Sequence, residues 1–237
     1  MNDATEMSGA TTLQTTLADL PTIIDPMIDA LDRTEPLTFE LFVPDRASNS
    51  APGLLVYISP KPGAKMPPAW AEVLNNANLV WVGANDSGNE VHVQRRVALA
   101  LAAPEAARAH CASLGINDIN ADRIYLAGFS GGGRVASMMA PVYPSRYQGA
   151  IYICGANPVS PMEEAQIVSL QSHRFVFLTG TRDFNNMDTQ FAVDLSRRAG
   201  LGGCALYVID GHGHALPEPG PVARCIEFLE GDDLAFD

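Results

Sequence analysis

The sequence predicts an α/β fold in which a mostly parallel β-sheet carries helices on both faces. Short apolar runs of strand length alternate along the chain with longer segments whose apolar residues recur at helical spacing. The runs at residues 53–58 and 174–178 are continuously apolar, which is typical of strands covered on both faces. With 237 residues and 47% hydrophobic content, the chain can bury one large core.

The individual elements follow from the same patterns. Strands are expected at residues 37–43, 53–58, 79–83, 123–127, 150–154, 174–178 and 205–209. Helices are expected at residues 68–76, 91–114, from 134 onward, 163–170, 187–198 and 222–229. Pro104 falls inside the second helix and is expected to divide or kink it, because proline cannot donate the backbone hydrogen bond.

Residues 1–36 are expected to form a partly irregular N-terminal arm on a single domain of residues 37–237. Apolar residues of this arm fall at the spacing of one helix face: Leu13, Leu17, Leu20 and Ile24. Pro21 and Pro26 interrupt that pattern, and the first residues are expected to be loose.

The charge and the terminal sequence exclude several classes of partner. The formal net charge of −12 argues against nucleic acid or an anionic membrane surface as a partner. No apolar run reaches the roughly 18 residues of a membrane span. The first residues lack a basic segment followed by an apolar one, so we expect no signal peptide and a cytoplasmic location, or export if a leader was removed.

The four cysteines are widely spaced and contain no C-x-x-C pair. Free thiols in a reducing compartment are therefore expected, and pairing of Cys204 with Cys225 is the alternative for an exported protein.

The stretch Gly128-Phe129-Ser130-Gly131-Gly132 fits the G-x-S-x-G pattern of a nucleophile elbow. A predicted strand precedes it and a predicted helix follows, so Ser130 lies at a strained strand-to-helix corner. Gly128 and Gly132 lack a Cβ, which lets the two chain segments pass. The free N–H groups and positive end of the helix beside Ser130 suit a developing oxyanion.

This glycine-rich turn has two other interpretations. It could be a tight strand-to-helix connection that has no catalytic role. It could also be a phosphate-binding loop, because residues 128–133 match the glycine spacing of that motif. Arg134 and Val135, however, stand where that loop needs Lys and then Ser or Thr, so the nucleophile elbow is favoured.

A serine nucleophile needs a base, and the base needs an orienting acid. Asp183 follows the strand at residues 174–178, and His214 follows the strand at residues 205–209. Taken singly, such an Asp is usually a turn residue and such a His a surface residue. The chain order Ser, Asp, His is nevertheless that of a hydrolase triad. Weaker candidates for the acid are Asp188 and Asp210.

Over residues 37–230 the chain resembles the compact α/β-hydrolases, in particular the dienelactone-hydrolase-like and polyhydroxybutyrate-depolymerase-like esterases. The resemblance implies an α/β-hydrolase fold without a large lid domain, and no cofactor. It carries over Ser130 as nucleophile, His214 as base and Asp183 as orienting acid. The Gly-x-Gly-His sequence ending at His214 resembles the histidine loop of that family and favours His214 over the neighbouring histidine.

The oxyanion hole departs from the family pattern. Many relatives carry His-Gly after the strand that ends here at residue 58, whereas this chain has Ser59 and Pro60. Proline has no N–H to donate. The resemblance therefore implies the N–H of Gly131 as one donor and the N–H of Lys61 as the second, with Ser59 as the alternative.

The sequence also contains a weak metal-site pattern. His212 and His214 with Asp210 could form a small cluster, but two histidines at i and i+2 with one carboxylate are a weak pattern, so no metal is expected.

These observations predict a serine hydrolase that cleaves small or short-chain carboxylic esters through an acyl-enzyme. About 50 residues separate Ser130 from Asp183, and they must hold two helices and a strand, so no room remains for a large lid. The expected partner is a small-molecule ester. Alternatives are a peptidase or thioesterase on the same triad, or a non-catalytic binding module that retains the elbow.

Overall fold

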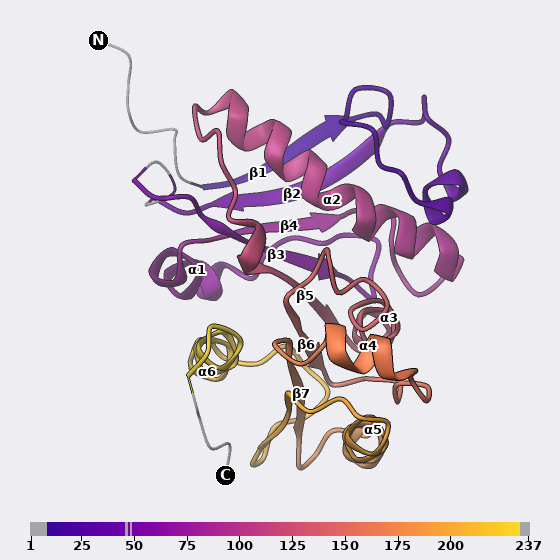
Figure 1. The fold of residues 1–237 in the computed structure, drawn as a ribbon. Coiled ribbons are helices and arrows are strands. Elements are labelled where there is room, and N and C mark those ends of the chain that lie inside the picture. Colours follow the sequence, from indigo (N-terminus) through magenta and orange to yellow (C-terminus); the bar gives the residue numbers. More distant parts are fainter. Residues whose placement is uncertain (1–8, 46, 48, 233–237) are drawn as a thin grey trace. The chain divides into compact units, whose positions relative to one another are not determined.

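A computed structural model describes residues 9–45, 47 and 49–232 of the chain (Figure 1). The chain divides into two compact units, Met1–Arg123 and Ile124–Asp237. Each unit contributes four strands, and each is described by itself below. The expectation of a single domain from residue 37 onward stays a prediction, and the expectation for residues 1–8 lies outside the described residues.

The first unit is a four-stranded sheet in the order β1-β2-β4-β3. Its strands are β1 (Gly9–Thr15), β2 (Leu37–Val43), β3 (Gly53–Ile58) and β4 (Leu79–Ala84). β1 and β4 both run antiparallel to β2, whereas β3 and β4 are parallel. All residues of β3 and β4 are buried, as their continuously apolar sequences predict.

Helices cover both faces of this sheet. They are α1 (Ala71–Ala77) and α2 (Val93–Ser113), with short 3-10 turns at Pro26–Ala30, Pro68–Trp70 and Ala121–Arg123. α2 packs on β2, β4 and β3, while α1 packs on β4 from the other side (Figure 1). Under α1, the rings of Tyr57 and Trp70 pack on Trp81 with centroids 4.5 and 5.8 Å away.

Two expectations for this unit need correction. α2 continues through Pro104, so the proline does not divide it, and the expected kink stays a prediction; the proline and the alanines around it are buried, and this packing outweighs the lost backbone hydrogen bond. Leu13 does not belong to a helix but to β1, which pairs with β2 over its full length. Leu17 and Leu20 are buried beyond it, whereas Ile24 is exposed.

The second unit is a fully parallel sheet in the order β5-β6-β7-β8. Its strands are β5 (Ile124–Phe129), β6 (Gly149–Ile153), β7 (Arg174–Gly180) and β8 (Cys204–Ile209). Its helices are α3 (Gly131–Met139), α4 (Glu164–Ser169), α5 (Asn186–Arg198) and α6 (Pro219–Leu229). α3 and α5 pack on one face and α6 on the other (Figure 1).

The mostly parallel α/β arrangement that the sequence predicts is confirmed, and each expected strand is present within about two residues of its expected bounds. Among the described helices, none has the length and apolar character needed to cross a membrane. Because the second unit is fully parallel, the carboxyl ends of its strands meet at one edge, and this is where the candidate site lies.

Candidate active site

Ser130 lies at a sharp corner between β5 and α3. Its backbone has φ 54° and ψ −119°, a left-handed conformation that residues with a side chain rarely adopt. The Ser130 N–H donates to the Ile153 carbonyl at 2.7 Å, and its own carbonyl accepts from Arg134 in α3. These bonds hold the strained residue in place and present its hydroxyl at the end of the sheet.

Glycines make this corner possible. A Cβ on Gly128 would collide with the carbonyl group of Gly132, as the sequence predicts. A Cβ on Gly133 would collide with the carbonyl oxygen of Gly155, and one on Gly155 would lie 2.5 Å from the Ser130 carbonyl oxygen. The corner is therefore packed backbone against backbone, so that Ser130 has little freedom to move.

The structure brings Ser130, His214 and Asp183 together in a hydrogen-bonded chain. His214 Nε2 lies 2.9 Å from Ser130 Oγ, and His214 Nδ1 lies 2.8 Å from Asp183 Oδ1. An ionised carboxylate can only accept, so Nδ1–H donates to Asp183 and the neutral ring leaves Nε2 to accept from the serine hydroxyl. This tautomer is the one in which the imidazole can take the proton of Ser130.

The position of Asp183 is fixed from several sides. Its Oδ2 accepts from Thr179 Oγ1 at 2.9 Å, and its Oδ1 accepts from the Asn185 N–H at 3.0 Å as well as from His214. Burial by itself would raise the pKa of the Asp183 carboxyl. Hydrogen bonds from Asn185, His214, Thr179 and Cys154 outweigh burial, so the pKa lies below its ordinary value and the carboxyl is ionised.

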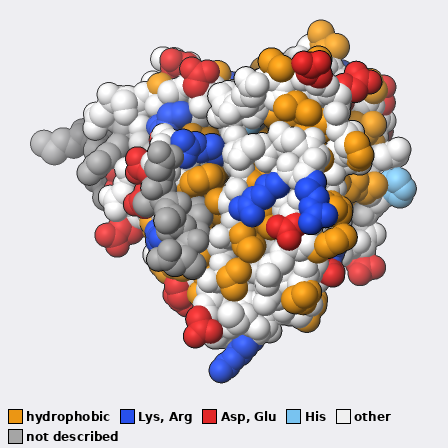
Figure 2. All heavy atoms as spheres, turned by 60° about the horizontal axis from the view of Figure 1, so that its bottom comes forward, with side chains coloured by type: hydrophobic (Ala, Val, Ile, Leu, Met, Phe, Trp, Pro, Cys, Tyr) orange, Lys and Arg blue, Asp and Glu red, His pale blue; other side chains and the backbone are white. Residues whose placement is uncertain are grey.

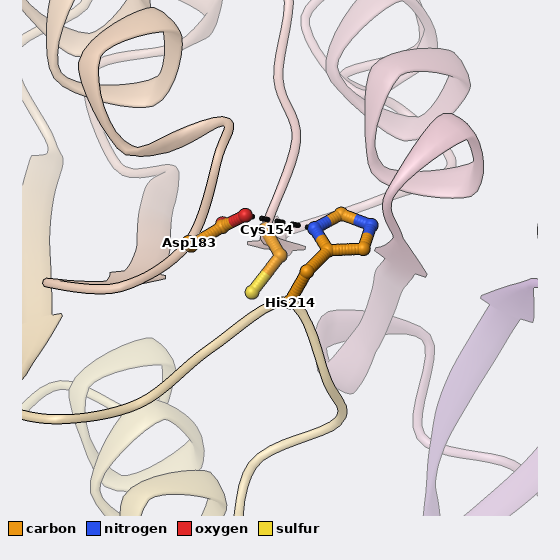
Figure 3. A group of neighbouring side chains, drawn as sticks. All are labelled: Cys154, Asp183 and His214. Atoms are coloured by element: carbon orange, nitrogen blue, oxygen red, sulfur yellow. Dashed lines mark hydrogen bonds and ion pairs between the residues drawn. The ribbon is translucent and has the colours of Figure 1, made fainter.

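Cys154 lies directly beneath the Asp183–His214 pair (Figure 3). Its sulfur is buried and is 3.6 Å from the Ala215 carbonyl oxygen in the histidine loop. Burial, and then the charge of Asp183, raise the pKa of the Cys154 thiol, so that it stays protonated. Its proton is available to the Asp183 carboxylate or to the carbonyls of the histidine loop.

Cys154, Asp183 and His214 are also the group of described residues whose ligand atoms lie close enough, within 4.8 Å, to be considered for a metal. The donor set does not suit one, because a neutral thiol is a poor ligand and His214 Nδ1 is occupied by Asp183. We therefore interpret the group as a hydrogen-bonded Asp–His pair supported by a thiol.

The weaker candidates from the sequence have other partners. Asp188 forms an ion pair with Arg134 at 3.1 Å. Asp210 accepts from Thr181 Oγ1 at 3.1 Å, and His212 bonds the Ala215 carbonyl through Nε2 at 3.0 Å. Among the described residues, His212, His214 and Asp210, the weak metal pattern of the sequence, do not bring their ligand atoms together as a group.

The two predicted oxyanion donors have different settings. Gly131 is the first residue of α3, where backbone N–H groups have no acceptor within the helix. Lys61 belongs to the loop after β3 in the first unit, and its N–H donates to Ser59 Oγ at 3.0 Å within that loop. The assignment of Lys61 as the second donor stays a prediction.

Sequence reasoning missed several residues around the triad. Thr179 and Asn185 both bond Asp183, and the Asn185 bond two residues beyond the aspartate is a turn that the sequence Asp-Phe-Asn could have indicated. Phe129 and Phe184 flank the His214 ring, with centroids 4.9 and 4.0 Å away. No spacing rule points to these ring contacts, because they depend on how the end of β5 and two separate loops meet.

No protein-family model matches the sequence, and none of the curated proteins matches it. Solved structures do resemble it. A ferulic acid esterase has a TM-score of 0.63 and 13% identity, with 94% of this chain and 98% of that chain covered. The Staphylococcus aureus S-formylglutathione hydrolase FrmB has a TM-score of 0.62 and 11% identity, covering 94% and 97% of the two chains. FphF, a fluorophosphonate-binding serine hydrolase of Staphylococcus aureus, has a TM-score of 0.65 and 12% identity, covering 95% and 99%. At these identities the likeness establishes a shared fold.

Proposed function

We propose that this chain, which has the α/β-hydrolase fold, is a serine hydrolase that cleaves small carboxylic esters through an acyl-enzyme. The observation that carries the proposal is the hydrogen-bonded chain from Ser130 Oγ through the His214 imidazole to Asp183, with both links at or below 2.9 Å. The names of the similar structures, which are esterases and serine hydrolases, support the same class of reaction.

The geometry suits a two-step acyl transfer. Ser130 Oγ attacks the acyl carbon while its proton moves to His214 Nε2. His214 then gives this proton to the departing alcohol oxygen as the bond between that oxygen and the acyl carbon breaks. Water attacks the acyl-enzyme in the same way, with His214 as base, and releases the acid. Asp183 keeps the imidazole in the required tautomer and stabilises its cationic form.

The developing oxyanion needs N–H donors near Ser130. The first turn of α3 supplies the N–H of Gly131 together with the positive end of the helix dipole. Between Ser130 and Asp183 the chain forms only α3, β6, α4, β7 and their connections, which supports an open site without a large lid. Small or short-chain esters are therefore the proposed substrates.

Labelling with a fluorophosphonate tests the proposal directly. We expect one adduct per chain in the wild type, which peptide mapping places on Ser130, and none in Ser130→Ala. His214→Ala should label far more slowly and, like Ser130→Ala, should lose on the order of 10⁴-fold in ester turnover. Both variants should keep the wild-type thermal midpoint to within a few degrees, because neither removes core packing.

A wild-type protein that neither labels nor hydrolyses esters, under conditions in which a control esterase does both, would contradict the proposal and favour a binding role. Labelling of Ser130 without ester turnover would keep the nucleophile but shift the substrate to a thioester or a peptide.

A further inference from the structure

Large apolar side chains are exposed next to the candidate active site. Phe184, Met187 and Phe191 have exposed fractions of 76, 75 and 61%. Figure 2 shows that hydrophobic side chains also lie at the surface, among charged ones, on the face to which it turns the molecule. Exposed apolar groups that lie next to one another are uncommon and often mark a binding surface.

We group these three residues by their exposure and their spacing in sequence, and call them the apolar strip. Met187 and Phe191 are four residues apart in α5 and therefore neighbours on one helix face. Phe184 precedes Met187 by three residues in the turn that leads into α5. The strip thus leads from the His214 ring, which Phe184 contacts with a centroid distance of 4.0 Å, along α5 and away from the triad.

The reaction chemistry says which part of an ester lies near His214. The imidazole returns its proton to the leaving oxygen, so that oxygen must come within hydrogen-bond distance of Nε2. The alcohol carbons attached to it then lie beside the imidazole, whereas the acyl chain extends from the other side of the attacked carbon. Because the Phe184 ring packs on the imidazole, the alcohol portion is the part of the substrate that reaches the apolar strip.

The carboxylate next to Met187 in sequence is paired, which accords with a neutral alcohol. Asp188 lies next to Met187 in sequence, but its carboxylate is paired with Arg134 at 3.1 Å. The flexible thioether of Met187 and the two aromatic rings suit varied alkyl or aryl groups.

Resting on the proposed function, we infer that the apolar strip of Phe184, Met187 and Phe191 binds the leaving alcohol and selects esters of apolar alkyl or aryl alcohols. The strip adds specificity for the alcohol side of the ester, while the acyl side is left to other residues.

A series of linear alkyl acetates from methyl to octyl acetate tests this inference. All members form the same acetyl-enzyme, and their alcohols differ little as leaving groups, so differences in kcat/KM report contacts with the alcohol chain. We expect kcat/KM of the wild type to rise about twofold per added methylene over the first several carbons, which is less than full burial of each methylene would give.

The matched variant is the double substitution Met187→Ala and Phe191→Ala, which shortens the strip without touching His214. We expect it to lower kcat/KM for octyl acetate about tenfold and to leave methyl acetate within about twofold of wild type. Phe184 is left intact because its ring contacts His214, and its loss would change the reaction of every ester. Val168→Ala, an exposed apolar residue on α4, serves as the control and should behave like the wild type.

A second series, methyl esters of acids from acetate to octanoate, separates the two sides of the substrate. The double variant should hydrolyse this series like the wild type. A flat alkyl acetate series in the wild type, or an equal loss on both series in the variant, would overturn the inference.

The apolar strip could instead join two copies of the chain. In that case the double variant would change the oligomeric state measured by sedimentation but would leave kcat/KM across the alkyl acetate series unchanged. This result would also overturn the inference. Absence of any ester turnover and of any fluorophosphonate adduct would overturn the proposed function and the inference with it.

Discussion

Asp183 illustrates at the scale of one residue how the candidate site is held. Its carboxylate accepts hydrogen bonds from Thr179 in β7, from Asn185 in its own turn and from His214, and the Cys154 thiol adds a fourth. A rotation of the side chain would break several of these bonds at once and leave a buried charge unpaired, which is strongly unfavourable. The Asp183 carboxylate is therefore held in hydrogen-bonding position to His214 before any substrate binds.

Asp183→Asn should lower kcat on the order of 10³-fold, because an amide can present its NH₂ to His214 and favour the wrong tautomer. Asp210→Asn should stay within about twofold of wild type, because its carboxylate bonds Thr181 and lies outside the triad. Kinetics on a chromogenic acetate, with circular dichroism to check folding, measure both. A nearly normal Asp183→Asn beside an inactive Asp210→Asn would reverse the assignment of the acid.

The sequence predicts the three triad residues because each one follows a strand whose apolar character is plain. Their supporting residues carry weaker signals. Cys154 is a single cysteine after a strand, and Phe184 is a single aromatic residue in a turn. Their contacts with the triad arise only when loops distant in sequence come together, and local periodicity holds no information on that arrangement.

At the scale of elements, the close packing of β5, α3 and the chain after β6 determines the geometry of the nucleophile corner. Gly133 and Gly155 face each other where a strand-end loop passes the first turn of α3. The sequence predicts the strand, the turn and the helix. It does not predict Gly155, because that residue belongs to the next strand connection and its role depends on how the neighbouring strands pair.

Gly133→Ala should lower the free energy of unfolding by about 1–3 kcal/mol, although alanine is normally the better helix former, because the new methyl group would collide with the Gly155 carbonyl. Ester turnover should fall as well, since relief of the collision moves the Ser130 corner.

Gly202→Ala is the matched control. Gly202 lies in the connection before β8, has open space where its Cβ would be and does not have the left-handed φ that requires glycine, so this change should leave stability unchanged or raise it by up to about 1 kcal/mol. Urea unfolding measures both variants. Equal effects of the two substitutions would show that the corner is not tightly packed.

At the scale of the whole molecule, we expect stability against acid to depend on the ionised Asp183 carboxylate. The chain has a formal net charge of −12 at pH 7, so mild acidification first reduces self-repulsion. Further acidification protonates carboxyls that the fold holds in the charged form. Asp183 is one of these, because its pKa in the folded protein is lowered.

The sign of this linkage follows from the lowered pKa. The charged form of Asp183 contributes stability above its unfolded pKa of about 3.9, and this contribution is lost as the pH falls through the lower folded value. We expect the free energy of unfolding to decrease more steeply from about pH 5 down to about pH 2 in the wild type than in Asp183→Asn. Urea titrations across this range measure it, and equal slopes would contradict the linkage.

The alternation of strands and helices is the part of the architecture that the sequence predicts best, because fully buried strands and amphipathic helices have strong periodic signals. β1 was not predicted because it lacks such a periodic signal. Most of its residues are exposed, so the strand shows no apolar alternation and owes its conformation to pairing with β2.

β1 covers the hydrogen-bonding edge of β2 from Leu37 to Val43. A chain shortened to begin at residue 37, where the arm was expected to end, would leave that edge open on a strand whose residues are almost all buried. Open apolar edges recruit further strands from other copies. By pairing with β2, residues 9–15 keep this edge from pairing with strands of other copies. We therefore expect the truncated protein to aggregate.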